Sequence, residues 1–351
     1  MYNKIVSSLI VIICIFLSSC NSSVKEKNIV VKELFSRDIQ LIEDSSVLKY
    51  PYRIFKSDSL MLIWDLHGKE YFFHAFNLVD YNTEFLYSFG RVGQGPEEFL
   101  ACAGMDFQDG LLSIIETNKS ILYTYPVSQL KQNNAKPSKI LELSKETSPI
   151  LKFADMGVGG KILLDSKGDS RFLLLDDKGE IESRNFKIPN MENKGLANPI
   201  LQQLWVSCLD YNPNNNILVI ATILGDVIEI YNLKEGGQII KIGEQGEPKI
   251  IRNGQQFILR SANGYQDVIV GNNEIYALYS DITHEEIDEA KKKGETAPNG
   301  GNLIYVLDFN AKVKNVFLLN RYINGFYIDF DKKTIYGVTS NSNIQLCIFN
   351  Y

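Results

Sequence analysis

The sequence predicts an all-β fold built from six similar units. From Glu33 onward, short apolar runs alternate with Gly, Asn, Asp and Lys at the spacing of β-hairpins. A second observation is a repeated phrase, in which GRVGQGPEEF at 90–99 has a shorter echo, IGEQGEP, at 242–248. Gly95 and Gly246 lie 151 positions apart, which suits three repeats of roughly 50 residues. These observations favour a repeat protein made of hairpins.

Each unit contains up to four strands, in which an apolar run is followed by a short polar turn and a second run. Six such units fit a six-bladed β-propeller of four-stranded antiparallel blades better than a sandwich, because radial closure leaves few exposed edges. An open array or a sandwich remains the alternative. The expected units are Tyr50–Gly90, Pro96–Leu143, Pro149–Pro189, Ile200–Gly243, Phe257–Leu319 and Tyr322–Tyr351.

The last unit supplies only three strands, because the chain stops after the strand Ile344–Tyr351. At the other end of the chain, the run Asp38–Glu43 (DIQLIE) is a strand that no unit claims. We expect this N-terminal strand to pair as the outer strand of the sixth blade and so to close the ring.

The first twenty residues have the pattern of an export signal. Lys4 supplies a positive charge, and Ile5–Leu17 is an apolar stretch that is short for a membrane span. The tetrapeptide Leu17–Cys20 (LSSC) resembles the lipobox of bacterial lipoproteins, in which the cysteine is acylated. An ordinary signal peptide or an uncleaved anchor is the alternative. We therefore expect a signal peptide at 1–19, a flexible tether at 20–32 and one propeller domain at 33–351.

Charge and cysteine content exclude several classes of protein. Without the first 19 residues, which carry one Lys and no acid, 35 basic and 42 acidic residues give a net charge of −7. A mildly acidic chain without a basic run is a poor candidate for binding nucleic acid. Cys102, Cys208 and Cys347 are widely spaced, so three buried thiols are expected, with one disulfide and a free thiol as the alternative. No CxxC motif or Cys/His cluster predicts a metal site.

In a propeller, the connections from strand 2 to 3 and from strand 4 to the next blade emerge on one face. The two glycine phrases are of the second kind, and the insertion Asp281–Gly301 is of the first kind, so all three are expected at one rim. Arg91 and the glycines could present an anion site, but Glu97 and Glu98 oppose an anion and the P-loop Lys is missing. We expect the glycines mainly to allow a tight crossing between blades. The ligand-face candidates are Arg91, Gln94, Glu97, Glu98, Glu244 and Glu247.

The insertion contains a predicted helix, since Thr283 and Glu286 form a capping box and Gly294 is a stop signal. With few apolar residues, it is expected to be a solvated surface helix, either a lid or decoration. Asp210, Asn212 and Asn214 have the spacing that begins a calcium loop, but the turn glycine and the bidentate glutamate are missing, so a hairpin turn explains them better. No catalytic arrangement and no cofactor motif can be assembled.

Three features together resemble the six-bladed β-propeller lipoproteins of Bacteroidota, a TolB-like or NHL-like group. These features are Leu17–Cys20, the six units and the phrase from Phe89 to Phe99. The echo departs from that pattern, because Glu247 precedes Pro248 and no Glu-Phe pair follows. The resemblance implies a propeller and a cell-envelope address, with little chemistry.

Two functions follow as hypotheses. The first is a non-catalytic binding or scaffolding lipoprotein for a protein, peptide or glycan ligand. The alternative is an enzyme of the glycan lyase, glycosidase or lactonase type, with acids at the glycine-loop face. We expect a monomer anchored by lipid to the outer membrane and facing the periplasm, with surface exposure as the alternative, because no acidic cluster follows Cys20.

Overall fold

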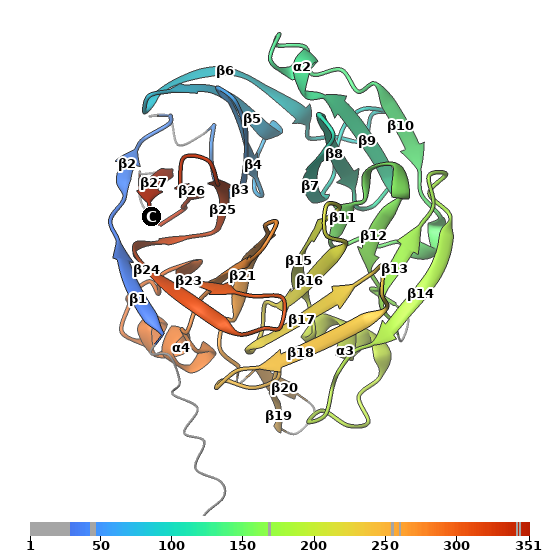
Figure 1. The fold of residues 1–351 in the computed structure, drawn as a ribbon, viewed down its shortest axis with the longest axis vertical. Helices are drawn as coiled ribbons and strands as arrows, with labels where there is room; N and C mark the ends of the chain where they lie inside the picture. The colour runs from blue at the N-terminus through green and yellow to red at the C-terminus, as the bar shows by residue number, and fades with distance from the viewer. Residues whose placement is uncertain are drawn as a thin grey trace, which may run out of the picture. The chain divides into compact units, whose positions relative to one another are not determined.

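The computed structural model describes residues 29–42, 47–167, 170–253, 256–259, 261–341, 343 and 345–351. The signal peptide, Cys20 and most of the expected tether lie outside these residues. Within the propeller unit, 31–351, the described strands form six sheets that surround one axis and one separate two-stranded sheet (Figure 1). The predicted six-bladed β-propeller is confirmed.

In every blade the strands that are consecutive in the chain follow one another from the axis outward and pair antiparallel, and an N-terminal strand is added at the outer edge of blades 5 and 6. Blades 1 to 3 are β3 (Pro51–Ser57), β4 (Leu60–Asp65), β5 (Tyr71–Val79) and β6 (Asn82–Arg91); β7 (Cys102–Gln108), β8 (Leu111–Glu116), β9 (Ile121–Pro126) and β10 (Lys139–Glu142); and β11 (Phe153–Asp155), β12 (Lys161–Leu164), β13 (Ser170–Leu175) and β14 (Ile181–Lys187). Blades 4 to 6 contain β15 (Ser207–Asn212), β16 (Ile217–Thr222), β17 (Val227–Asn232) and β18 (Gly237–Ile242); β21 (Tyr265–Val270), β22 (Ile275–Tyr279), β23 (Gly301–Leu307) and β24 (Val313–Ile323); and β25 (Gly325–Asp329), β26 (Thr334–Val338) and β27 (Leu346–Asn350).

The ring closes through an N-terminal strand, as the sequence predicts. Strand β2 (Arg37–Ile39) pairs antiparallel with β27, and Asp38 lies opposite Cys347. The side chain of Gln345 extends this contact, because its Oε1 accepts a hydrogen bond from the backbone N–H of Leu41 at 2.7 Å. Strand β2 begins one residue before the expected Asp38–Glu43 and ends at Ile39, and Glu43 lies outside the described residues.

Blade 5 has a fifth strand that the sequence pattern does not predict. Strand β1 (Val30–Leu34) pairs with β24 at the outer edge of that blade. Its first residues belong to the stretch expected to be a tether. Only Leu34 of this strand is buried, and its other residues are exposed, so the sequence lacks the apolar alternation that would mark a half-buried strand.

The hydrophobic core is divided among the six junctions between neighbouring blades. Each junction has its own cluster of buried apolar side chains, such as Phe73 with Tyr123 between blades 1 and 2, or Ile63 with Val338 between blades 1 and 6. Fully burying one such side chain contributes roughly 1.5–3 kcal/mol. The blades are therefore held face to face, and the inner strands are left to line a central channel.

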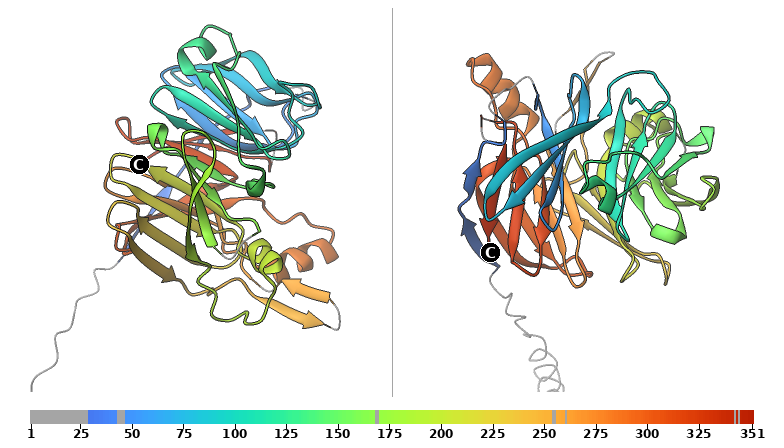
Figure 2. Two further views of the ribbon diagram at one scale, coloured as in Figure 1. Left: turned by 90° about the vertical axis from the view of Figure 1, so that its right-hand side faces the viewer. Right: turned by 90° about the horizontal axis from the view of Figure 1, so that it is seen from above.

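The predicted surface helix is present in the insertion between β22 and β23. Helix α4 (His284–Lys292) begins with a complete capping box between Thr283 and Glu286, and none of its residues is buried. Figure 2 shows α4 and the hairpin of β19 (Ile250–Asn253) and β20 (Gln256–Leu259) projecting from the same face of the ring. The backbone N–H of Asn263 donates to the carbonyl oxygen of Ile282 at 2.8 Å and ties the two insertions together.

The remaining short elements lie in connections. They are α2 (Val127–Leu130), the 3-10 turns η1 (Lys145–Thr147) and η2 (Gly157–Gly159), and α3 (Asn198–Leu204). Within the described residues, no helix is long and apolar enough to cross a membrane. Cys102, Cys208 and Cys347 are free thiols in strands β7, β15 and β27, but only Cys208 and Cys347 are buried, whereas Cys102 is half-buried.

Candidate ligand site in the central channel

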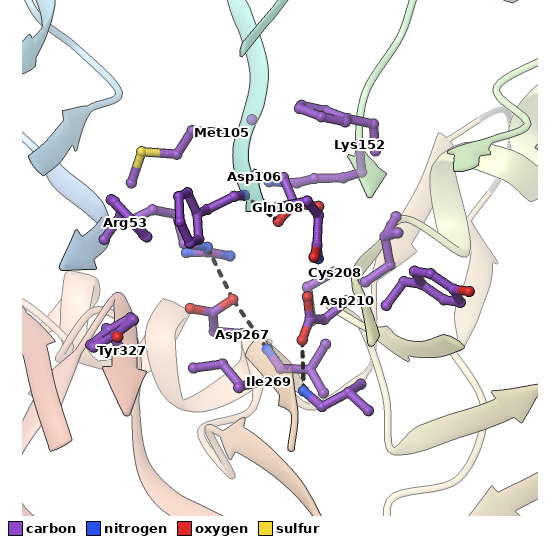
Figure 3. A pocket seen from close by; sticks show the side chains of 18 of the residues that line it. Arg53, Met105, Asp106, Gln108, Lys152, Cys208, Asp210, Asp267, Ile269 and Tyr327 are labelled. Atoms are coloured by element: carbon purple, nitrogen blue, oxygen red, sulfur yellow. Dashed lines mark hydrogen bonds and ion pairs between the residues drawn. The ribbon is translucent and has the colours of Figure 1, made fainter. Parts of the chain in front are cut away.

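The innermost strands of the six blades enclose a cavity of about 350 Å³ (Figure 3). It extends from the middle of these strands to Gln108 and to Pro213 and Asn214, which lie where the first strands of blades 2 and 4 turn back. We call this end of the channel the turn face and the opposite end the glycine-loop face. No lining residue comes from the 90–99 loop or from the 243–248 loop.

Toward the glycine-loop face, Arg53 of β3 spans the channel. Its Nε lies 3.1 Å from Oδ1 of Asp267 in blade 5, and its Nη1 donates to the carbonyl oxygen of Asn324 at 2.8 Å. The guanidinium also covers the ring of Tyr52, with Cζ 3.9 Å from the ring centroid. Lys152 of blade 3 donates from Nζ to the hydroxyl of Tyr52 at 3.2 Å. These contacts join blade 1 to blades 3, 5 and 6.

Three aspartates on inner strands each accept a hydrogen bond from the backbone of the next blade. Asp106 accepts from the N–H of Asp155 at 2.5 Å, and Asp210 accepts from the N–H of Val270 at 2.6 Å. Asp267 accepts from the N–H of Phe326 at 3.1 Å. A carboxylate that replaces a missing backbone acceptor stabilises the junction between two separate sheets. These acids therefore help to hold the ring as well as line the cavity.

Asp106 and Asp210 lie on either side of the short strand β11 and interact electrostatically. Burial, together with the charge of Asp155, raises the pKa of Asp106 to about 7. Burial and the charge of Asp106 raise the pKa of Asp210 well above its ordinary value. Figure 3 shows both side chains beside the same open space. Removing a carboxylate from water disfavours its charged form, and a second negative charge nearby disfavours it further.

The pKa of Asp106 predicts how stability varies with pH. The ordinary value is 3.8 and the folded value is about 7, so between these values the folded protein holds a proton that the unfolded chain releases. This contribution to the free energy of unfolding is complete below about pH 4 and is lost as the pH rises toward 7. In Asp106→Asn it should disappear, so denaturant unfolding at pH 5 and pH 8 should give a smaller difference than in the wild type. An unchanged difference would contradict the assignment.

An aromatic wall borders the cavity at the turn face. The rings of Phe55 and Phe107 lie 4.5 Å apart between centroids, and Tyr327 meets Phe55 edge-on at 6.1 Å. These side chains come from blades 1, 2 and 6 and are among the residues that line the cavity. Aromatic faces beside charged and amide groups suit a ligand that is partly apolar and partly polar.

The glycine phrase 90–99 forms a loop packed on blades 1 and 2. Oε2 of Glu98 accepts from the N–H of Gly95 at 2.9 Å, and a Cβ on Gly93 would lie only 2.0 Å from that same oxygen. Lys119 of blade 2 donates to the carbonyl oxygens of Gly95 and Glu98, both at 2.7 Å. Of the candidates in this loop, Arg91, Gln94 and Glu97 are exposed.

In the second loop, Glu244 is exposed, whereas Glu247 is buried. The Glu247 carboxylate accepts from the N–H groups of Met191 at 2.9 Å and Glu192 at 3.1 Å, and so it holds the connection that precedes α3. The six predicted ligand-face residues thus lie at the glycine-loop face and outside the channel cavity. Their role in binding stays a prediction.

The sequence pattern does not mark the acids of the channel as site residues. It predicts Asp210 only as part of a turn, and that turn is present, because Oδ1 of Asn212 accepts from the N–H of Asn214 at 2.9 Å. One signal that could have found the acids is a polar residue inside the first apolar run of a unit, as at Asp106 and Asp267. In the described residues, no group of three His, Cys, Asp or Glu side chains could hold a metal ion.

Comparison with known proteins decides the family. The family model described as TolB-like 6-blade propeller-like matches residues 20–331. The chain belongs to this family. A search of curated sequences finds no significant match for this TolB-like propeller.

Solved structures similar to this TolB-like propeller include two proteins of Bacteroides. One, from Bacteroides fragilis, is named as an exported protein; it is 12% identical, with a TM-score of 0.52, over 91% of this chain and 98% of that one. The other is a member of the DUF4221 family from Bacteroides vulgatus; it is 12% identical, with a TM-score of 0.55, over 92% of this chain and 97% of that one. At this identity, the similarity shows the fold alone.

Proposed function

We propose that this TolB-like propeller is a non-catalytic binding protein of the cell envelope, anchored by lipid at Cys20, which holds a peptide or glycan at the turn face of its channel. The observation that carries the proposal is that the acids of the cavity already hold neighbouring blades together. Asp106, Asp210 and Asp267 accept backbone N–H groups of neighbouring blades, so moving them during a reaction would disturb the fold. The aromatic wall beside them supplies contact area without chemistry.

A specific observation favours the alternative, an enzyme. Asp106 and Asp210 are a coupled pair of carboxyl groups, and a pKa of about 7 at Asp106 suits general acid and base chemistry near neutral pH. The binding function is preferred because Asp106 has both carboxylate oxygens occupied, by the N–H groups of Phe107 at 2.7 Å and Asp155 at 2.5 Å.

The binding proposal predicts a ligand whose affinity depends on the aromatic wall. The mature protein would be applied to arrays of glycans and peptides, and each ligand found would be measured again by calorimetry. Phe107→Ala should weaken binding by about tenfold or more, since it removes a stacking face. The control Glu97→Gln changes an exposed residue at the glycine-loop face and should leave affinity unchanged. The opposite pattern would place the ligand at the glycine-loop face, and turnover of a glycan that Asp210→Asn abolishes would favour the enzyme.

If the protein is anchored by lipid at Cys20, removing that thiol should release the protein from the membrane. Cys20→Ala should leave the protein soluble in the periplasm or unprocessed, because the acyl chains contribute roughly 0.8 kcal/mol per buried CH₂ to membrane binding. Membrane fractionation and metabolic labelling with a fatty acid measure this change. Normal fractionation of the variant with the membrane would contradict the anchor.

A further inference from the structure

The charged side chains that line the channel cavity are not balanced among themselves. Arg53 and Asp267 form an ion pair at 3.1 Å. The other three charged lining residues, Lys152, Asp106 and Asp210, form no ion pair with any residue that the structure describes. Lys161, whose charge acts on Asp106, is paired with Asp155 at 2.9 Å. The cavity therefore holds one cation and two acids that lack partners of opposite charge.

These unpaired groups are separated along the channel axis. Lys152 precedes β11, and its carbonyl oxygen accepts from Leu164 at the glycine-loop end of β12. Asp106 lies opposite Ser113 and Asp210 opposite Val219, both within the half of the strand pair nearer the turn face. The cavity is thus positive toward the glycine-loop face and acidic toward the turn face.

The positive end is bordered by a buried aromatic ring. Trp64 lines the cavity and is 2% exposed. The Nζ of Lys152 lies 5.5 Å from the Trp64 ring. Although burial opposes it, the charges of Arg53 and Lys152 lower the pKa of Tyr52, which indicates a positive field at this end. An ammonium in such a field suits a carboxylate ligand.

We infer that the cavity binds a small zwitterion, an α-amino acid or a dipeptide, with its ammonium between Asp106 and Asp210 and its carboxylate beside Lys152 and Trp64. This inference rests on the proposed binding function and names its ligand. The volume of about 350 Å³ is at the low end of small-molecule pockets, roughly 300–1,000 Å³, so it admits such a ligand and excludes a folded protein. A bound ammonium also favours the charged forms of the two acids, which burial otherwise disfavours, and a neutral sugar would not do this.

The test uses calorimetry on the mature protein. The probes are the twenty L-amino acids and the dipeptides Gly-Gly and Gly-Lys, with methylamine and acetate as ligands that carry only one of the two charges. At least one amino acid or dipeptide should bind the wild type, and methylamine and acetate should bind at least about tenfold more weakly. Failure of every amino acid and dipeptide to bind at millimolar concentration would overturn the inference.

Two variants assign the ends of the ligand. Asp210→Asn removes the carboxyl group that would pair with a bound ammonium and keeps an oxygen that can accept from Val270. Lys152→Met removes the ammonium and keeps the apolar stem on Tyr52. Each should weaken the zwitterion by about tenfold or more, whereas only Asp210→Asn should weaken methylamine and only Lys152→Met should weaken acetate. Thermal unfolding of each variant checks its fold. Equal affinities in wild type and both folded variants would overturn the inference.

The outcomes separate this inference from the proposed function. Suppose that a ligand found on the arrays loses affinity in Phe107→Ala but not in Lys152→Met. This result would support the binding function and reject the zwitterion. Calcium would be tested as a further probe. If calcium were the only probe that bound, and if its binding depended on Asp210, the cavity would be a cation site and the zwitterion would also be rejected.

Discussion

Replacing Arg171 with leucine is expected to lower the free energy of unfolding by about 3–5 kcal/mol, because it leaves a buried carboxylate without its cation. Arg171 is 1% exposed and lies on β13 of blade 3. Its Nη2 is 2.7 Å from Oε1 of Glu229 on β17 of blade 4, and its Nη1 donates to the carbonyl oxygen of Trp205 at 3.0 Å. Denaturant unfolding monitored by tryptophan fluorescence measures the loss.

Two controls define the interpretation of this loss. Lys314→Met removes a half-exposed ion pair with Glu274 and should cost roughly 0–1 kcal/mol. The double variant Arg171→Leu, Glu229→Leu should lose less free energy of unfolding than the two single variants lose together, since no unpaired charge stays buried. A loss below about 1 kcal/mol in Arg171→Leu would mean that this ion pair does not hold blades 3 and 4 together.

Replacing Phe99 with alanine is expected to cost about 3–5 kcal/mol, the range for emptying a buried aromatic site. Phe99 ends the glycine phrase and is fully buried, with its ring 4.9 Å from Tyr123 and edge-on to Phe73 at 6.2 Å. Its backbone N–H donates to the carbonyl oxygen of Arg91 at 2.8 Å, which closes the loop on itself. The loop therefore packs as part of the junction between blades 1 and 2.

The neighbouring residue offers a matched control for this site. Leu100 is 45% exposed, so Leu100→Ala should change the free energy of unfolding by no more than about 0.5 kcal/mol. Equilibrium unfolding in urea compares the two variants directly. Equal and small losses would show that the glycine loop is not part of the packed core.

Sequence periodicity predicts the blades well because each blade is a local structure. A hairpin is encoded by a short apolar run, a turn and a second run, and the expected unit Ile200–Gly243 contains all four strands of blade 4. The closing strand could be predicted because a three-stranded last unit leaves an unpaired edge. The sequence did not predict β1, because its exposed residues lack the alternation that marks a half-buried strand.

The channel could not be predicted in the same way. Asp106, Asp210 and Asp267 stand in three separate units, and they meet only because the ring brings inner strands together around one axis. Each appears in the sequence as a single polar residue within an apolar run. The candidates at the glycine loops stood out because glycine and proline mark a loop locally, whereas convergence at an axis leaves no local mark. The capping box at Thr283 is local and was predicted correctly.

A crystal structure of the mature protein with a ligand found on the arrays tests most directly whether the channel cavity is the binding site. We expect electron density for the ligand inside the cavity at the turn face, in contact with Phe107 and with Asp106 or Asp210. Density at the glycine-loop face, against Arg91, Glu97 or Glu244 and with only water in the cavity, would contradict it.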